Sequence, residues 1–109
     1  MTRVVGGDDE VPTEGRFFVY VLASRQYGAL YIGVTGNLPA RIAIHRDDIL
    51  QGHTERYGIH RLVWFEQHDD PREAITHEKQ LKKWRRAWKI EVIESTNPEW
   101  NDLFEEIAE

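Results

Sequence analysis

Two apolar runs near the start of the chain predict a β-hairpin. The first, residues 17–23, is apolar at every position, and the second, residues 30–34, again combines aromatic and branched side chains. A polar gap that contains a glycine, residues 24–28, separates them by the length of a hairpin loop. Since a strand with two apolar faces is covered on both, we expect residues 17–23 to be the central strand of their sheet.

A helix is expected directly after the hairpin. Asn37 is a favourable N-cap and Pro39 follows in the first turn, so the pattern predicts a helix from there to about residue 50. Its apolar stripe consists of Leu38, Ile42 and Ile49. Arg41 and His45 are four residues apart and therefore stand together along one edge of this helix.

The second half of the chain repeats the alternation of strand and helix. Residues 61–67 predict a third strand, and a capping box then predicts the start of a second helix at Asp70, Pro71 and Glu73. The apolar stripe expected for this helix is Ala74, Leu81 and Trp88. The predicted fold is α/β: a small three-stranded, largely antiparallel sheet flanked by helices, in the order β-β-α-β-α.

Two further helical segments are expected near the C-terminus. One runs from about residue 87 to 94 and is broken by residues 95–98. After the break, helical spacing predicts a short amphipathic helix that docks on the core through Trp100, Leu103, Phe104 and Ile107. Asn97 precedes a proline, where its side chain can stabilise the turn.

Composition places the chain among small globular domains. It has 109 residues, of which 40% are hydrophobic, and four each of Trp, Tyr and Phe. No run has the length of a membrane span or the apolar core of a signal peptide, so we expect a cytoplasmic protein without membrane contact. Residues 1–16 lack apolar periodicity and are expected to be a flexible acidic tail, with a single domain over residues 17–109.

The charge is distributed unevenly along the chain. The net charge is −5, but residues 17–90 carry +4 and residues 91–109 carry −7. Six basic residues fall between positions 79 and 89 without an intervening acid: Lys79, Lys82, Lys83, Arg85, Arg86 and Lys89. Such a run is either a solvated helix face or a surface that binds phosphates.

Glu78 is the acidic residue with the most chemical information. It falls inside the apolar stripe of the second predicted helix, where an unpaired carboxylate costs several kcal/mol and therefore needs a cation or good donors. The alternatives are a salt bridge to Lys82, one turn on, and a divalent ion such as Mg²⁺, which binds through one or two carboxylates, waters and phosphate.

Other sites are less favoured by the pattern. There is no cysteine, and none of the five histidines stands in a His-x-x-x-His pair with a supporting acid, so the sequence does not predict a zinc site. A nucleophile elbow and a P-loop are also absent from it. Residues 51–60 read as a loop, in which His53, Arg56 and Tyr57 either contact nucleic acid or are plain surface residues.

Several short motifs, in order, resemble the GIY-YIG endonuclease family in its small single-domain bacterial form. They are Tyr31-Ile32-Gly33, Arg41 eight residues later, His45, Glu78 within Glu-Lys-Gln-Leu-Lys-Lys-Trp, and Asn97-Pro98-Glu99-Trp100. The first motif departs from the family pattern, because Phe18-Val19-Tyr20 keeps the tyrosine and replaces the glycine. The resemblance covers roughly residues 17–104.

The resemblance implies a metal-dependent endonuclease, a hydrolase that cleaves phosphodiester bonds, with DNA as the expected substrate and Mg²⁺ or Mn²⁺ as the expected cofactor. DNA repair is one pathway that such an activity would serve. The implied catalytic residues are Tyr20 as base, Tyr31 as positioning group, Arg41 on the phosphate, His45 beside them and Glu78 on the metal. The expected nucleic-acid contacts are Lys79, Lys82, Lys83, Arg86 and Arg56, and Gly33 and Asn97 are expected to be structural.

Two alternatives stay open beside the nuclease. One is a module of the same fold that binds nucleic acid with little or no catalysis, and the other is a protein-interaction domain whose acidic C-terminal segment binds a basic partner. The choice between DNA and RNA, the structure that is cut and the oligomeric state are not readable from these residues.

Overall fold

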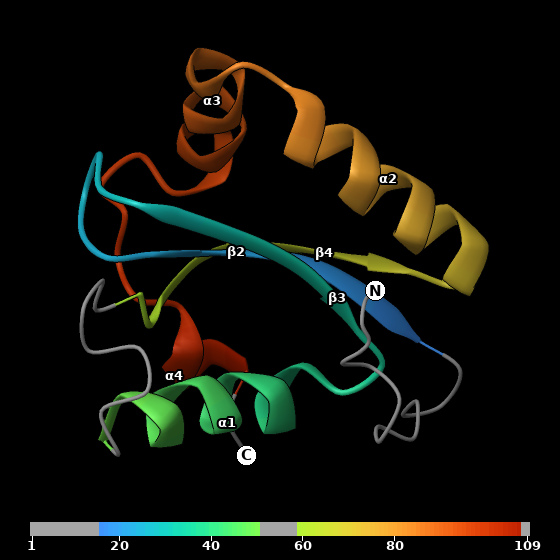
Figure 1. Ribbon diagram of the computed structural model, residues 1–109, viewed down its shortest axis with the longest axis horizontal. Helices are drawn as coiled ribbons and strands as arrows, with labels where there is room; N and C mark the ends of the chain where they lie inside the picture. Colours follow the sequence, from blue (N-terminus) through green and yellow to red (C-terminus); the bar gives the residue numbers. More distant parts are fainter. Residues whose placement is uncertain (1–15, 51–58, 108–109) are drawn as a thin grey trace.

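The structure is a computed structural model that describes residues 16–50 and 59–107, except for the side chains of residues 45 and 47–50. The elements are β2 (Phe17–Ala23), β3 (Leu30–Thr35), α1 (Leu38–Leu50), β4 (Arg61–His68), α2 (Pro71–Lys83), α3 (Arg86–Thr96) and α4 (Phe104–Ile107). Figure 1 shows α1 and α4 on one side of the sheet and α2 and α3 on the other. The predicted α/β fold and its element order are therefore confirmed.

The sheet has the strand order β3-β2-β4, and both pairings are antiparallel. The prediction that residues 17–23 form the central strand is confirmed. Side chains alternate along β2 between two core clusters, because successive residues of a strand point to opposite faces. Val19, Val21 and Ala23 belong to the cluster under α2 and α3, whereas Tyr20 and Leu22 belong to the cluster over α1.

The hairpin loop is held by a residue from the basic run. Within the loop, Gly28 N–H donates to the Arg25 carbonyl at 2.8 Å, and Tyr27 has a positive φ of 61°. Arg86 donates to the carbonyls of both Tyr27 and Gly28 at 2.7 Å. This arginine therefore joins the start of α3 to the β2–β3 loop, a structural contact that the sequence did not predict.

The predicted apolar stripe of the second helix is correct at Ala74 and Leu81 and wrong at Trp88. Trp84 ends α2 with an extended backbone of φ −66° and ψ 148°, and α3 begins two residues later. Because the extended residues reset the helical phase, Trp88 no longer continues the buried stripe and is 48% exposed. The helix that was expected over residues 87–94 is α3, and it runs on to Thr96.

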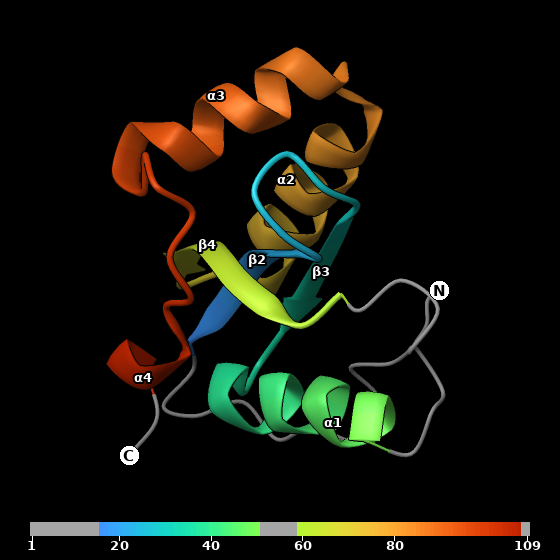
Figure 2. The ribbon, with the colours of Figure 1, turned by 90° about the vertical axis from the view of Figure 1, so that its left-hand side faces the viewer.

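The predicted C-terminal amphipathic helix is only partly present. Its helical part is the four-residue α4, and Trp100 lies before it with a φ of 59° and no exposed surface. Trp100 packs in the cluster under α2 and α3, and its indole N–H donates to Glu94 at 2.8 Å. Leu103, by contrast, packs in the cluster over α1. The segment thus crosses from one face of the sheet to the other instead of continuing as one helix (Figure 2).

This crossing covers the outer edge of β4. Leu103 N–H donates to the Leu62 carbonyl at 2.8 Å, and the Asp102 carboxylate accepts from Leu62 N–H at 3.2 Å. Asp102 also pairs with Arg46 of α1. Although burial raises the pKa of Asp102, the Arg46 guanidinium and the N–H groups of Phe104 and Leu62 outweigh it, so the pKa is lower than usual.

None of the helices in the described residues is both long and apolar enough to cross a membrane. Apart from Arg16, the tail expected over residues 1–16 lies outside the described residues, as do His53, Arg56 and Tyr57 of the expected loop.

Candidate active site

The two motif tyrosines lie on the same face of the sheet. Tyr20 is directly opposite Gly33, and Tyr31 is directly opposite Leu22, so both rings face the α1 side. Their ring centroids are 6.2 Å apart. Tyr20 is buried, at 1% exposure, whereas Tyr31 stands on the edge strand and is 42% exposed. The pair therefore has one inner and one solvent-facing phenol.

Gly33 makes room for the inner tyrosine. A Cβ atom at this position would lie 2.5 Å from the Tyr20 hydroxyl and 2.6 Å from its ring carbon Cζ. Any side chain would displace the ring, because real Cβ contacts are never this short. The third residue of the Tyr31-Ile32-Gly33 motif is thus needed for the position of Tyr20 on the neighbouring strand.

The departure from the family pattern at Phe18 has a packing explanation. Phe18 points to the same face as Tyr20, since the two residues are two apart on β2. Its ring meets that of Phe65 on β4 edge-on, with the centroids 6.3 Å apart. Both rings pack against the core cluster that contains Tyr20. The large side chain therefore extends the apolar core beside the tyrosine.

The start of α1 is fixed by the turn that follows β3. Asn37 caps the helix as predicted: its side chain accepts from Ala40 N–H at 3.3 Å, and its carbonyl accepts from Arg41 N–H at 3.0 Å. Thr35, at the end of β3, accepts from Asn37 N–H at 3.0 Å. Leu38 and Ile42 are buried with Tyr20, and Arg41 is half-buried beside them.

His45 follows Arg41 by one turn on α1, but its side chain lies outside the described residues. Of the two side chains predicted to share an edge of this helix, the structure therefore describes only that of Arg41.

Glu78 lies in the opposite layer, on α2. Asp70 caps this helix, as predicted, through a 2.8 Å hydrogen bond from Arg72 N–H, so the partner is Arg72 instead of the Glu73 expected for a capping box. Glu78 is 8% exposed and lies between Ala74 and Leu81, which confirms the inward position read from the sequence.

The partner of this carboxylate is a lysine. Lys82 approaches Glu78 Oε2 at 2.6 Å, so the salt bridge that was one of the two alternatives is formed. The contact is to Oε2 of the carboxylate. The tyrosine pair faces the α1 side, so the sheet lies between this pair and α2. Because α2 contacts β2 and β3, and β3 is an edge strand, a ligand that touches both faces would have to pass the outer edge of β3.

Asn97 is buried, at 4% exposure, and acts as a junction of the backbone. Its amide nitrogen donates to the carbonyls of Val63 at 3.1 Å and Asn101 at 2.8 Å. Its amide oxygen accepts from Asn101 N–H at 3.0 Å. The residue thus ties the end of α3 to β4, which is the turn role expected from the sequence.

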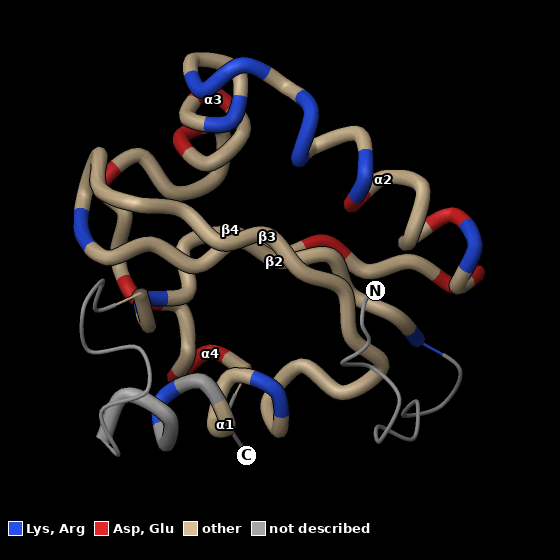
Figure 3. The backbone as a smooth tube through the Cα atoms, in the orientation of Figure 1, with Lys and Arg blue, Asp and Glu red and all other residues tan. Residues whose placement is uncertain are grey.

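The basic residues form a band over the end of α2 and the start of α3 (Figure 3). Lys79 and Lys83 are exposed, whereas Lys82 is paired with Glu78 and Arg86 holds the hairpin loop. The exposed ring of Trp88 lies at the same end, with the Arg85 guanidinium 5.1 Å from its centroid. All four of the expected nucleic-acid contacts on α2 and α3 are exposed, but Lys82 and Arg86 also have the partners just named, and Arg56 lies outside the described residues.

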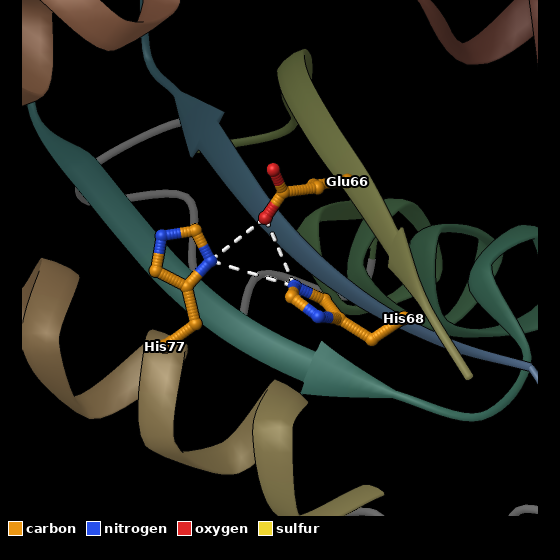
Figure 4. Close-up of side chains that lie close together, drawn as sticks. All are labelled: Glu66, His68 and His77. Carbon is orange, nitrogen blue, oxygen red and sulfur yellow. Dashed lines mark hydrogen bonds and ion pairs between the residues drawn. The ribbon is translucent and has the colours of Figure 1, made fainter. Parts of the chain in front are cut away.

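One polar cluster was missed by the sequence analysis. Glu66 and His68 of β4 and His77 of α2 place one ligand atom each within 4.8 Å of one another (Figure 4). No His-x-x-x-His pattern marks this cluster, because its ligands come from a strand and a helix. Two features of the sequence are consistent with it. Glu66 and His68 are two apart on a strand and so point to the same face, and His77 follows Ala74, which faces the core, by about one helical turn.

Two comparisons place this architecture among known proteins. The structure defines an α/β domain with a tyrosine pair and a helical arginine on one face of a three-stranded antiparallel sheet. The GIY-YIG catalytic domain matches residues 16–91. The chain therefore belongs to the GIY-YIG family, which indicates a nuclease-type domain.

A relative of similar size shares much of this sequence. The UPF0213 protein CPE1444 of Clostridium perfringens (strain 13 / Type A) is 36% identical over 78 residues, which are 72% of this chain and 83% of the relative. No solved structure gives a significant match.

Proposed function

We propose that the protein is a metal-dependent endonuclease that hydrolyses phosphodiester bonds in DNA. The observation that supports this most directly is the tyrosine pair, fitted over Gly33 and facing the helix that carries Arg41, in a chain of the GIY-YIG family. Core packing alone does not account for Tyr31, which lies on an edge strand and is 42% exposed.

The groups of the tyrosine face match the needs of phosphodiester hydrolysis. The planar guanidinium of Arg41 suits the two free oxygens of a phosphate, because it presents several donors in one fork. Tyr20 is the proposed base and Tyr31 positions the phosphate or the attacking water. A free phenol has a pKa of about 10, so the use of Tyr20 as a base near neutral pH requires positive charge close by. Arg41, on the helix that covers the same face of the sheet, would supply that charge.

The residues present fit a divalent metal at Glu78. The carboxylate is largely buried and is a hard oxygen ligand of the kind that Mg²⁺ and Mn²⁺ bind. Lys82 holds Oε2, and Oε1 would hold the ion together with waters and the substrate phosphate. Bound there, the ion would supply Lewis-acid stabilisation of the departing oxygen. A DNA strand that reaches Arg41 and Glu78 together must lie along the outer edge of β3.

The test is cleavage of a small panel with Mg²⁺ or Mn²⁺: single-stranded, duplex, flapped and four-way DNA, and a structured RNA. We expect Arg41→Ala and Glu78→Gln each to lower the cleavage rate by about 100-fold or more, since each removes a charge that acts on the phosphate. Matched controls are Arg72→Ala and Glu73→Gln on the exposed face of α2, which should cut like the wild type. Cleavage that persists in both Arg41→Ala and Glu78→Gln would contradict the proposal.

A module that binds nucleic acid without cutting it is the second candidate, and the Glu78–Lys82 salt bridge favours it. In that pair the lysine already provides the cation that the buried carboxylate needs. This function predicts salt-sensitive binding to a member of the panel that is unchanged in Glu78→Gln, with no cleavage by the wild type.

The third function considered, a protein-interaction domain with an acidic C-terminal segment, receives less support. Two of the acids in this segment have partners inside the domain: Glu94 accepts from Trp100, and Asp102 pairs with Arg46. Their charges serve the fold, which leaves fewer to attract a basic partner.

A further inference from the structure

The cluster formed by Glu66, His68 and His77 has the ligands and the spacing of a metal site. Glu66 Oε1 lies 2.9 Å from His68 Nε2 and 2.7 Å from His77 Nδ1, and the two nitrogens are 3.4 Å apart. Three ligand atoms at the corners of a tetrahedron around Zn²⁺ are separated by about 3.3 Å, given bonds of about 2.0–2.1 Å. The nitrogen pair is already at this separation, and the carboxylate oxygen needs to move by about half an ångström.

The fold holds these three side chains in place before any ion binds. Glu66 is opposite Val19, and His68 is opposite Phe17, so both project toward α2 from the end of β4. His77 projects from α2, and its ring packs edge-on against the ring of Trp64, with the two centroids 6.2 Å apart. The histidine side chains are only 16% and 26% exposed, which limits the rotamers they can adopt.

The donor set selects a transition metal. Two imidazole nitrogens and one carboxylate oxygen suit Zn²⁺ and its neighbours, whereas Mg²⁺ prefers oxygen ligands. The Glu66 side chain is 44% exposed, so the fourth position of a tetrahedron faces water. We propose that Glu66, His68 and His77 bind a divalent transition-metal ion, with Zn²⁺ as the probe, and that this ion joins β4 to α2.

The contacts in the absence of an ion also favour this assignment. If both imidazole N–H groups donate to the same Glu66 oxygen, two donors face each other across 3.4 Å, which is not a hydrogen bond. An ion bound here would take the place of these two protons, each of which would move through solvent to the other nitrogen of its neutral imidazole, so that two ring lone pairs and one carboxylate oxygen become ligands. A cluster that only stabilised the fold would gain from spreading its donors over both carboxylate oxygens.

The proposed ion is separate from the metal that the nuclease proposal assigns to Glu78. His77 and Glu78 are neighbours on α2, and consecutive residues of a helix point about 100° apart. His77 lies over β4, whereas Glu78 is directed into the core and pairs with Lys82. The inference does not depend on nuclease activity, and its consequence is mechanical: the ion fixes the helix that carries Glu78 against the sheet.

For the test, the 109-residue chain without a tag is first treated with a chelator, which is then removed. ZnCl₂ is next titrated into this metal-free protein in an isothermal titration calorimeter. We expect one Zn²⁺ per chain and a rise in the thermal midpoint when Zn²⁺ is present. His68→Ala and His77→Ala should each weaken Zn²⁺ binding by about tenfold or more and remove the rise, because a two-ligand site holds the ion poorly. The visible absorption of Co²⁺ bound in place of Zn²⁺ should show four-coordination in the wild type.

Matched variants separate the site from other histidines and from folding. His60→Ala removes a histidine outside the cluster, and Glu78→Gln removes the proposed nuclease ligand. Both should bind Zn²⁺ like the wild type. His77→Gln keeps a hydrogen-bonding side chain of similar size, so it should stay folded by circular dichroism and still lose the ion.

Three outcomes would overturn the inference: no stoichiometric Zn²⁺ binding by the wild type, equal binding by His77→Gln, or loss of binding in Glu78→Gln. The last would place the ion at the nuclease site. Failure of DNA cleavage leaves the metal result unaffected, so the two proposals fail separately.

Discussion

The two faces of the sheet differ in how their polar groups come together. On the α1 face, Tyr20, Tyr31, Gly33 and Arg41 all come from one unbroken segment of hairpin, turn and helix. On the α2 face, Glu66, His68 and His77 come from a strand and a helix joined by a turn, and they meet only after the helix has packed on the sheet. The first arrangement is local in sequence, and the second depends on the angle and register of packing.

This difference predicts how mutations affect each face. The α1 face depends on steric fit between neighbouring strands, so a single added carbon disturbs it. The polar groups of the α2 face, and those at the end of α3, are held by hydrogen bonds and ion pairs. Removal of one partner therefore lowers stability through a lost contact and not through a steric clash.

The largest effect is expected for Gly33→Ala. The new Cβ would lie 2.5 Å from the Tyr20 hydroxyl, so the buried ring must move, and overpacking of this kind costs about 1–3 kcal/mol. We expect the free energy of unfolding in urea to fall by that amount and any DNA cleavage to be lost with it. In a Tyr20→Leu background the same change should cost much less. An equal cost in both backgrounds would show that the clash is not with the tyrosine.

A smaller loss of stability is expected for Asn97→Ala. It removes three hydrogen bonds, of which water can replace the two to the exposed Asn101, so the main loss is the partner of the Val63 carbonyl, at a cost of about 1 kcal/mol. The matched control is Asn101→Ala, because Asn101 takes part through its backbone and its side chain is exposed. Urea unfolding that ranks the two variants equally would rule out the junction role of Asn97.

The smallest effect concerns pH and the tether between α1 and the C-terminal segment. Because the pKa of Asp102 is lower in the folded than in the unfolded chain, its contribution to stability is present above the unfolded value of about 3.9. It is lost as pH falls through the folded value. With the Asp102 side chain 36% exposed, solvent screening limits the contribution to about 1 kcal/mol or less.

Asp102→Asn should therefore be less stable than the wild type at pH 7, and the difference should shrink on acidification to about pH 3. Urea unfolding at several pH values measures this, with Glu105→Gln in the exposed part of α4 as the control. A difference that grows toward acid would refute the assignment.

Much of the fold was predictable because it is encoded by local rules. The unbroken apolar run at residues 17–23 predicted a central strand, and Asn37 and Asp70 marked the helix starts that the structure shows. The prediction failed where local rules no longer determine the chain. Trp88 was placed on a continuous stripe because nothing in its spacing reveals that Trp84 turns the backbone into an extended conformation.

Trp100 shows the same limit. Its spacing to Leu103, Phe104 and Ile107 is helical, yet it packs on the opposite face of the sheet, because the intervening residues bond to the edge of β4. The interaction that prevails is the hydrogen bond from Leu103 N–H to the Leu62 carbonyl. These residues are about forty positions apart, so a local sequence pattern does not reveal the contact.

By itself, the sequence determined the α/β class, the central strand, the inward position of Glu78 and the motif order that marks the family. These follow from apolar periodicity and capping, which act over a few residues. Only the tertiary structure decided that Arg86 holds a loop, that Glu78 pairs with Lys82, and that Glu66, His68 and His77 converge. Those contacts depend on how a helix packs across a sheet, which is set by side-chain volumes distributed over the whole core.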